Sequence, residues 1–201
     1  MIKNVFFDFG QVLINFIPYD MTKAYVSDEQ DIKLVEEVVF DRLYWDRLDE
    51  DLITDEQVIE DVYRRLPQRL HQLAHKVYFN WIYNIPEIAG MEDIVVRLKE
   101  NGVNICILSN ISRTFINNYK ECQILRHFDR HVFSAEIGLV KPHKEIFEYA
   151  LKTNGFVAEE TLFIDDREDN IQGAKKVGIN GYVFDGNVKK LEEYLKSIGL
   201  L

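Results

Sequence analysis

Residues 5–13 read Val-Phe-Phe-Asp-Phe-Gly-Gln-Val-Leu. The stretch begins with a short apolar run, residues 5–7, which the aspartate Asp8 follows. A run that is apolar on both faces predicts a buried strand of a parallel sheet. Similar runs lie at residues 103–108, 132–133, 162–164 and 182–184. Amphipathic segments ending at Gly or Asn-Gly predict helices between these runs, at residues 91–100, 142–153 and 167–177. This alternation predicts an α/β fold with a doubly wound parallel, Rossmann-like sheet.

Residues 16–87 differ in texture from the rest of the chain. Apolar residues recur there at spacings of three and four, as at Ile32, Val35 and Val39, which is typical of helices with one buried face. The segment holds eight basic and sixteen acidic residues, and so carries most of the chain's net charge of −10. We therefore expect a helical insertion, residues 16–87, within a core domain made of residues 1–15 and 88–201.

The composition narrows the class of partner. The chain has 201 residues, 47% of them hydrophobic and 29% charged, which is typical of a globular protein. Its net charge repels phosphate backbones and anionic lipids, so we expect neither nucleic acid nor membrane as a partner. The chain has two cysteines, Cys106 and Cys122, no long apolar run and no signal peptide, so we expect it in the cytoplasm. We expect a small molecule as its ligand, and a monomer or weak homodimer as its state.

Polar residues gather where the predicted strands end. In an open α/β sheet, ligands bind beyond the carboxyl ends of the strands. The residues after the strands, and the one before the helix at residue 142, are Asp8, Ser109, Asn110, Asp165, Asp166 and Lys141. Singly, each has a simpler interpretation as a helix cap or a solvated surface group. Two adjacent aspartates, however, exceed what one cap needs.

If these side chains lie together at one edge of the sheet, they favour one kind of chemistry. Three carboxylates in a small volume repel one another, so either a proton or a cation must compensate. Hard oxygen ligands suit Mg²⁺, which also allows a carboxylate to approach an anionic phosphoryl group. Lys141 and Ser109 would then bind the phosphoryl oxygens, where negative charge sits in the transition state. The set favours phosphoryl transfer to Asp8.

Four segments in this order resemble the motifs of the haloacid dehalogenase superfamily of hydrolases. They are residues 5–13, 107–110, 138–142 and 163–170. The helical insertion after the first motif is similar to the small helical cap of that superfamily. The Phe-Asp-Phe-Gly sequence with an acidic pair in the fourth motif most resembles the helical-cap phosphatase branch that includes α-glucose-1-phosphate phosphatase.

The resemblance implies a role for each matching residue. It makes Asp8 the nucleophile that becomes an aspartyl phosphate, with Ser109 and Lys141 as catalytic groups that hold phosphate oxygens. Asn110 would lie beside them in the substrate site. The implied Mg²⁺ ligands are Asp8, the backbone carbonyl of Gly10, Asp166, and Asp165 either directly or through water, with Asn170 supporting the acidic pair.

Gly10 departs from the pattern of the resembled phosphatases. They usually carry a second aspartate at this position as general acid and base, a function worth about 10²- to 10⁴-fold in rate. We therefore expect substrates whose leaving group needs little protonation, such as an anomeric sugar oxygen or an aryl phosphate. A residue of the helical insertion or a water molecule is the alternative proton source.

The function expected is that of a Mg²⁺-dependent phosphatase for a small phosphorylated metabolite, with a sugar phosphate such as a hexose 1-phosphate favoured. Two alternatives belong to the same superfamily. A 2-haloacid dehalogenase works without metal, which the pair Asp165 and Asp166 argues against. A phosphonatase depends on a lysine of the cap, for which Lys23, Lys33 and Lys76 are available. The third alternative is a noncatalytic binding module.

Overall fold

The computed structural model describes residues 1–118 and 122–201. Its centre is a parallel sheet of five strands in the order β3-β2-β1-β4-β5. The strands are β1 (Asn4–Phe7), β2 (Asn104–Ser109), β3 (His131–Phe133), β4 (Thr161–Asp165) and β5 (Asn180–Val183). This confirms the doubly wound α/β sheet predicted from the apolar runs.

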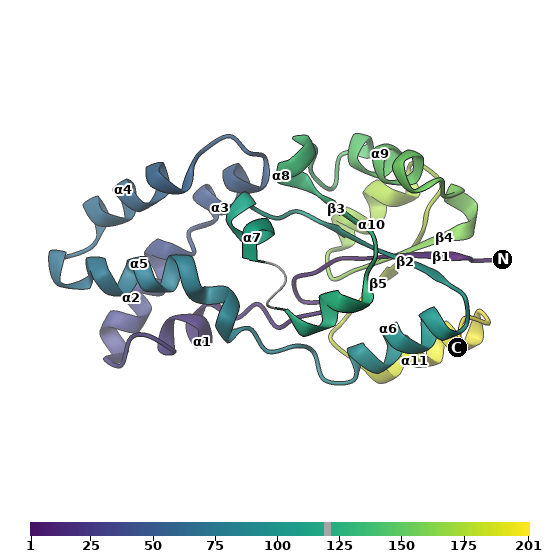
Figure 1. The fold of residues 1–201 in the computed structure, drawn as a ribbon, viewed down its shortest axis with the longest axis horizontal. Coiled ribbons are helices and arrows are strands. Elements are labelled where there is room, and N and C mark those ends of the chain that lie inside the picture. Colours follow the sequence, from purple (N-terminus) through teal and green to yellow (C-terminus); the bar gives the residue numbers. More distant parts are fainter. Residues whose placement is uncertain (119–121) are drawn as a thin grey trace.

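Helices cover both faces of the sheet. Helices α6 (Met91–Glu100) and α11 (Val188–Ser197) lie on one face, and α9 (Lys144–Asn154) and α10 (Glu168–Lys175) lie on the other (Figure 1).

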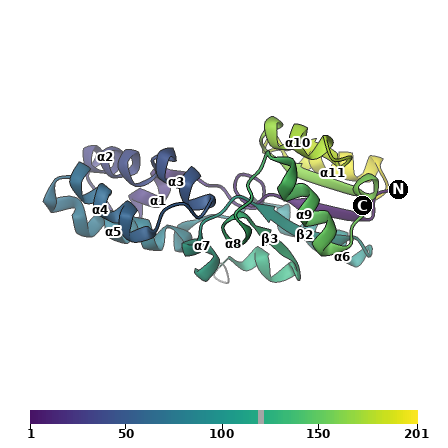
Figure 2. The same ribbon diagram turned by 90° about the horizontal axis from the view of Figure 1, so that it is seen from above.

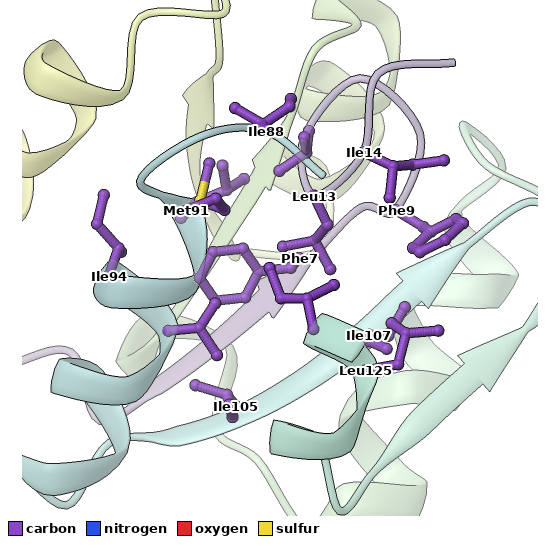
Figure 3. Close-up of a cluster of buried hydrophobic side chains, with 14 of the residues drawn as sticks. Phe7, Phe9, Leu13, Ile14, Ile88, Met91, Ile94, Ile105, Ile107 and Leu125 are labelled. Atoms are coloured by element: carbon purple, nitrogen blue, oxygen red, sulfur yellow. The ribbon is translucent and has the colours of Figure 1, made fainter. Parts of the chain in front are cut away.

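Successive side chains of β1 point to opposite faces, as strand geometry requires. Phe7 therefore packs in the cluster beneath α6, where Met91 and Ile105 are its neighbours (Figure 3), and Phe6 packs in the cluster beneath α9. Both rings are fully buried, so β1 is the apolar centre of the molecule.

The helix expected at residues 142–153 begins at Lys144 instead. Pro142 lies in a turn, preceded by a cis Lys141–Pro142 peptide bond. This turn packs closely on α10, because a β-carbon at Gly173 would lie 2.3 Å from the carbonyl oxygen of Pro142. The absence of a side chain at Gly173 thus allows the turn that carries Lys141 to lie against α10.

The helical insertion forms its own layer. It consists of α1 (Pro18–Lys23), α2 (Glu29–Val39), α3 (Arg42–Asp49), α4 (Asp55–Arg65), α5 (His71–Asn80) and two 3₁₀ helices (Gln68–Leu70 and Trp81–Asn84). Helix α4 begins with a capping box, in which Thr54 and Gln57 exchange side-chain to backbone hydrogen bonds. The helices pack around a separate cluster of buried side chains and lie beyond the carboxyl ends of the strands (Figure 2).

The two connections to the helical insertion run side by side. Ile14 and Glu87 form an isolated antiparallel bridge. The amide of Asn15 donates to the carbonyl of Pro86 at 2.8 Å, and the amide of Ile88 donates to the carbonyl of Leu13 at 3.0 Å. The chain therefore enters and leaves the insertion at one place.

A second contact links the helical insertion to α7 (Arg113–Asn118), which follows β2. Arg113 binds both carboxylate oxygens of Asp51, at 2.6 and 2.7 Å, and Thr114 donates to Asp55. The remaining short elements are α8 (Ser134–Ile137) and the 3₁₀ helices Gln123–His127 and Ala158–Glu160. Among the described residues, no helix is long and apolar enough to span a membrane.

Candidate active site

Asp8 stands at the carboxyl end of β1, the central strand. Its backbone amide donates to the carbonyl of Ile164 at 2.9 Å, which aligns the end of β1 with the end of β4. Its Oδ1 atom accepts hydrogen bonds from the Ser109 hydroxyl at 2.8 Å and from the Phe9 amide at 2.7 Å. The Asp8 side chain is 11% exposed, so most of its charge is removed from water.

Lys141 joins Asp8 to the acidic pair after β4. Its ammonium nitrogen lies 2.8 Å from Oδ1 of Asp8 and 2.8 Å from Oδ2 of Asp165, and its side chain is 1% exposed. Asp165 is itself held by Asn170, whose Nδ2 atom lies 3.0 Å from each carboxylate oxygen, and by the Arg167 amide at 2.8 Å. The structure therefore brings residues from three strand ends and one turn together.

Asn110 anchors the turn that carries Lys141. Its Nδ2 atom donates to the Lys141 carbonyl at 3.1 Å, and its Oδ1 atom accepts from the Lys141 amide at 2.8 Å. A two-way bond of this kind fixes the backbone of Lys141 directly across from Asp8. Asn110 also lines the cavity described below.

Burial and the neighbouring charges shift the protonation of these groups. Burial, assisted by the charge of Asp165, raises the pKa of Asp8 to about 6, although Lys141 and Ser109 oppose the shift. Burial alone would lower the pKa of Lys141, but the two carboxylates beside it outweigh burial and raise it. Burial and Asp165 together raise the pKa of Asp166. The negative charge of the three carboxylates is thus only partly neutralised, because a single ammonium group contacts two of them.

The same carboxylates fit a divalent cation. Asp8, Asp165 and Asp166 each offer one oxygen atom, and these three atoms lie within 4.8 Å of one another. All three ligands are hard oxygens, the type that Mg²⁺ prefers. The Oδ1 atom of Asn170 behind them is buried and accepts no hydrogen bond from the residues that the structure describes. The site therefore offers the oxygen ligands that Mg²⁺ prefers and a negative charge that such an ion would neutralise.

A cavity of about 230 Å³ opens over Asp8. Its polar floor comes from the sheet and the segments that follow its strands, and includes Asp8, Gly10, Ser109, Asn110, Lys141, Arg167 and Asn170. Its opposite wall is aromatic and is formed by Phe16, Phe40, Trp45 and Trp81, whose rings contact one another at centroid distances of 5.4 to 5.9 Å. Three polar residues of α3, Arg42, Asp46 and Asp49, also line it, together with Phe9, Gln11, Ile14, Ile111 and Ser112. Asp165 and Asp166 do not line the cavity, although their carboxylates lie close to that of Asp8.

The family model of the haloacid dehalogenase-like hydrolases matches residues 5–184, a span that includes all of the sheet except Asn4, the helical insertion and all the residues of the floor. The chain belongs to this family.

Relatives of this haloacid dehalogenase-like hydrolase include named phosphatases. The D-ribitol-5-phosphate phosphatase of Bacteroides thetaiotaomicron is 25% identical over 196 residues, which cover 90% of this chain and 91% of that protein. The glyceraldehyde 3-phosphate phosphatase of Methanocaldococcus jannaschii is 44% identical over 68 residues. That match covers 33% of this chain and 30% of the relative, so the chain spans less than a third of that protein's length.

A solved structure supports the fold of this haloacid dehalogenase-like hydrolase. It is an Asp-to-Ala variant of a family enzyme from Bacteroides thetaiotaomicron in complex with magnesium and inorganic phosphate. The two chains superpose with a TM-score of 0.70 at 20% identity, over 96% of this chain and 99% of the other. At this identity the superposition bears on the fold alone.

The polar residues of α3 were absent from the sequence-based site. Arg42, Asp46 and Asp49 have the spacing of an ordinary solvated helix face, and nothing in their sequence separates them from the other charged residues of the helical insertion. Only the packing of α3 across the end of the sheet brings them to the cavity.

Proposed function

We propose that this haloacid dehalogenase-like hydrolase is a Mg²⁺-dependent phosphatase that cleaves phosphomonoesters of small metabolites through an aspartyl phosphate at Asp8. One observation carries the proposal: the buried Asp8 carboxylate lies within hydrogen-bonding distance of Ser109 and Lys141 and beside two further carboxylates. A nucleophile and donors for phosphoryl oxygens thus share one cavity floor, and two further ligands for a cation lie beside the nucleophile. The two named phosphatases among the relatives support the same reaction class.

Asp8 has one carboxylate oxygen available for attack. Its Oδ1 atom is held by Ser109, Phe9 and Lys141, whereas Oδ2 accepts no hydrogen bond from the described residues. The attack would form a bond between an Asp8 oxygen and phosphorus while the bond from phosphorus to the leaving-group oxygen breaks. Fixing Oδ1 by three donors orients the carboxylate before substrate arrives, which lowers the entropic cost of the step.

Ser109 and Lys141 would bind the nonbridging phosphoryl oxygens. Both side chains are almost fully buried, so their dipole and charge act in a medium of low dielectric constant. Asn110 would act through Lys141, because it fixes the backbone on both sides of that residue's α-carbon.

Asp8, Asp165 and Asp166 would hold the magnesium ion, together with the backbone carbonyl of Gly10. When bound, Mg²⁺ supplies the positive charge that reduces repulsion between the carboxylates and the phosphoryl group. Asn170 would keep Asp165 in a fixed orientation, because it hydrogen-bonds both oxygens of that carboxylate.

The leaving group would lie between the floor and the aromatic wall. We assign residues 16–87 to a cap domain over a core made of residues 1–15 and 88–201, because the wall and α3 come from the former or from its edge. Flat aromatic rings suit the C–H face of a sugar ring, so a sugar phosphate such as a hexose 1-phosphate fits the wall. The sugar and polyol phosphates named for the two relatives point to the same class.

A panel of metabolite phosphates tests the proposal. We expect phosphate release with Mg²⁺, no release with EDTA, and none from Asp8→Asn in either condition. The matched control is Asp169→Asn, which makes the same change at an exposed position of α10 outside the cavity. Rapid quenching and intact-mass measurement should detect one phosphoryl group on the wild type and none on Asp8→Asn. Release by Asp8→Asn at the rate of the Asp169→Asn control would refute the assignment of the nucleophile.

A further inference from the structure

The floor of the cavity offers no group to protonate the leaving oxygen. An alkoxide leaves phosphorus slowly unless a proton reaches its oxygen, and a positioned acid is worth about 10²- to 10⁴-fold. Gly10 has no side chain, and the neighbouring donors Ser109 and Lys141 are engaged with Asp8. The two remaining sources of the proton are a water molecule and a carboxyl group on the opposite wall of the cavity.

We propose that Asp49, the last residue of α3, is the catalytic acid that protonates the leaving-group oxygen, and the base that later accepts a proton from water. The inference rests on the phosphatase function proposed above. Asp49 lines the same cavity as Asp8 and Gly10, from the side where the leaving group would lie. Its side chain is partly buried and, among the described residues, takes part in no hydrogen bond or ion pair.

A neighbouring carboxylate on the same helix shows the contrast. Asp46 also lines the cavity, three residues before Asp49. It is exposed, and its Oδ1 atom lies 2.9 Å from Arg42 in an ion pair. The guanidinium of Arg42 therefore occupies a carboxylate oxygen of Asp46. Of the two carboxyl groups that α3 presents to the cavity, only Asp49 is free to exchange a proton with a ligand.

Burial favours the protonated form of Asp49, and the surrounding charges act in both directions. The charged side chains near it, or on elements packed against α3, include Arg42, Asp46 and Arg47 of α3, the adjacent Glu50, Asp8, Lys141 and Arg167 of the cavity floor, and Glu136 of α8. Burial raises the pKa of Asp49 to about 8, with further increases from Asp46 and Asp8 that Lys141 and Arg42 partly oppose. A carboxyl that keeps its proton at neutral pH meets the requirement for a general acid.

The two steps balance. In the first, an Asp8 oxygen bonds to phosphorus, the ester bond breaks, and the leaving oxygen takes the proton of the Asp49 carboxyl. In the second, the Asp49 carboxylate takes a proton from a water molecule, the water oxygen bonds to phosphorus, and the bond between phosphorus and Asp8 breaks. The sum is ester plus water giving alcohol plus phosphate, with both aspartates restored.

Gly10 provides a rescue position. A β-carbon built at Gly10 meets no atom within 4 Å, so an aspartate side chain has room to enter the cavity there. An acid placed at residue 10 would reach the leaving group from the floor and would make the acid on α3 redundant.

The test compares leaving groups with the full chain and Mg²⁺. Wild type, Asp49→Asn, the control Asp46→Asn and the double variant Gly10→Asp/Asp49→Asn are assayed on two esters. One is the alkyl phosphate that the wild type hydrolyses best, and the other is 2,4-dinitrophenyl phosphate, whose leaving group departs as a stable anion. Thermal melting verifies that each variant folds; Asp49→Ser replaces Asp49→Asn if the latter does not.

We expect Asp49→Asn to lower kcat/KM for the alkyl ester by about 10²- to 10⁴-fold. Dinitrophenolate release should be nearly unchanged in the first turnover and should appear as a burst, because the second step lacks its base. Asp46→Asn should change kcat/KM for both esters by the same factor. The double variant should recover kcat/KM for the alkyl ester.

Equal losses on the two esters, or a leaving-group dependence identical to that of Asp46→Asn, would overturn the role of Asp49 and leave the phosphatase intact. A wild type that releases phosphate from neither ester would overturn both proposals.

Discussion

Replacing Lys141 by methionine should destabilise the protein strongly at neutral pH without Mg²⁺. The substitution keeps the length of the apolar stem and removes the only ammonium that contacts both Asp8 and Asp165 in the described part of the chain. At an effective dielectric constant of about 20, each 2.8 Å pair is worth about 6 kcal/mol before the opposing cost of desolvation. Removing one partner of a buried pair costs about 3–5 kcal/mol net.

Urea denaturation at pH 7.5 in EDTA measures this loss. The fluorescence of Trp45 and Trp81, which both line the cavity, reports unfolding. In a thermal melt in the same buffer, a loss of about 3–5 kcal/mol should lower Tm by about 6–20 °C, at about 2–4 °C per kcal/mol for a chain of this size. The matched control is Lys144→Met, whose partner Glu148 lies 3.4 Å away at an exposed site. An exposed pair of this kind is worth about 0–1 kcal/mol.

The loss in Lys141→Met should shrink as the pH falls. The pKa of Asp8 is already raised from 3.8 to about 6 in the folded wild type. The folded state then binds a proton that the unfolded state lacks, so the free energy of unfolding decreases as pH rises from about 4 through the folded pKa. Without Lys141 that pKa rises further, and acidification to pH 5 should recover part of the stability. A loss no larger than that of Lys144→Met, or one independent of pH, would refute the account of the site's charge balance.

Three further predictions concern the metal, the packing and the aromatic wall. Mg²⁺ should raise Tm of the wild type more at pH 7.5 than at pH 5, since its ligands must be ionised, and Asp166→Asn should reduce the increase; an equal increase in that variant would contradict the ligand assignment. Gly173→Ala should cost about 1–3 kcal/mol in urea denaturation, because its β-carbon would lie 2.3 Å from the Pro142 carbonyl; no loss would show that the turn moves freely. Trp45→Ala should raise KM for a sugar phosphate while leaving inhibition by inorganic phosphate unchanged, and a parallel change in both would place the ring against the phosphoryl group instead.

The sheet and the floor of the cavity could be predicted because local pattern determines both. Five apolar runs mark the five strands, of which the edge strand β5 is only partly buried, and parallel strands bring whatever follows them to one edge. Asp8, Ser109 and Asp165 therefore meet wherever such a sheet forms. Lys141 could be placed near them from its position before an expected helix, but the turn against Gly173 that carries it could not be predicted.

The wall of the cavity could not be predicted in the same way. The apolar spacing in the helical insertion indicates which side of each helix is buried, but not how the layer is oriented against the sheet. Asp49 shows the difference: its sequence neighbours Asp46 and Glu50 are equally acidic and both exposed. Its distinct environment arises from tertiary packing, which places the end of α3 over Asp8.

The adjacent connections at Ile14 and Glu87 make the helical insertion replaceable as a unit. Because the two crossing points are hydrogen-bonded neighbours, a foreign stretch of any length can replace residues 16–87 if its own ends lie equally close. A graft at these joints would carry over the leaving-group preference of the donor and keep the phosphoryl chemistry of the host. If Asp49 supplies the proton, a graft must also bring an acid of its own, so selectivity and turnover would be inherited together.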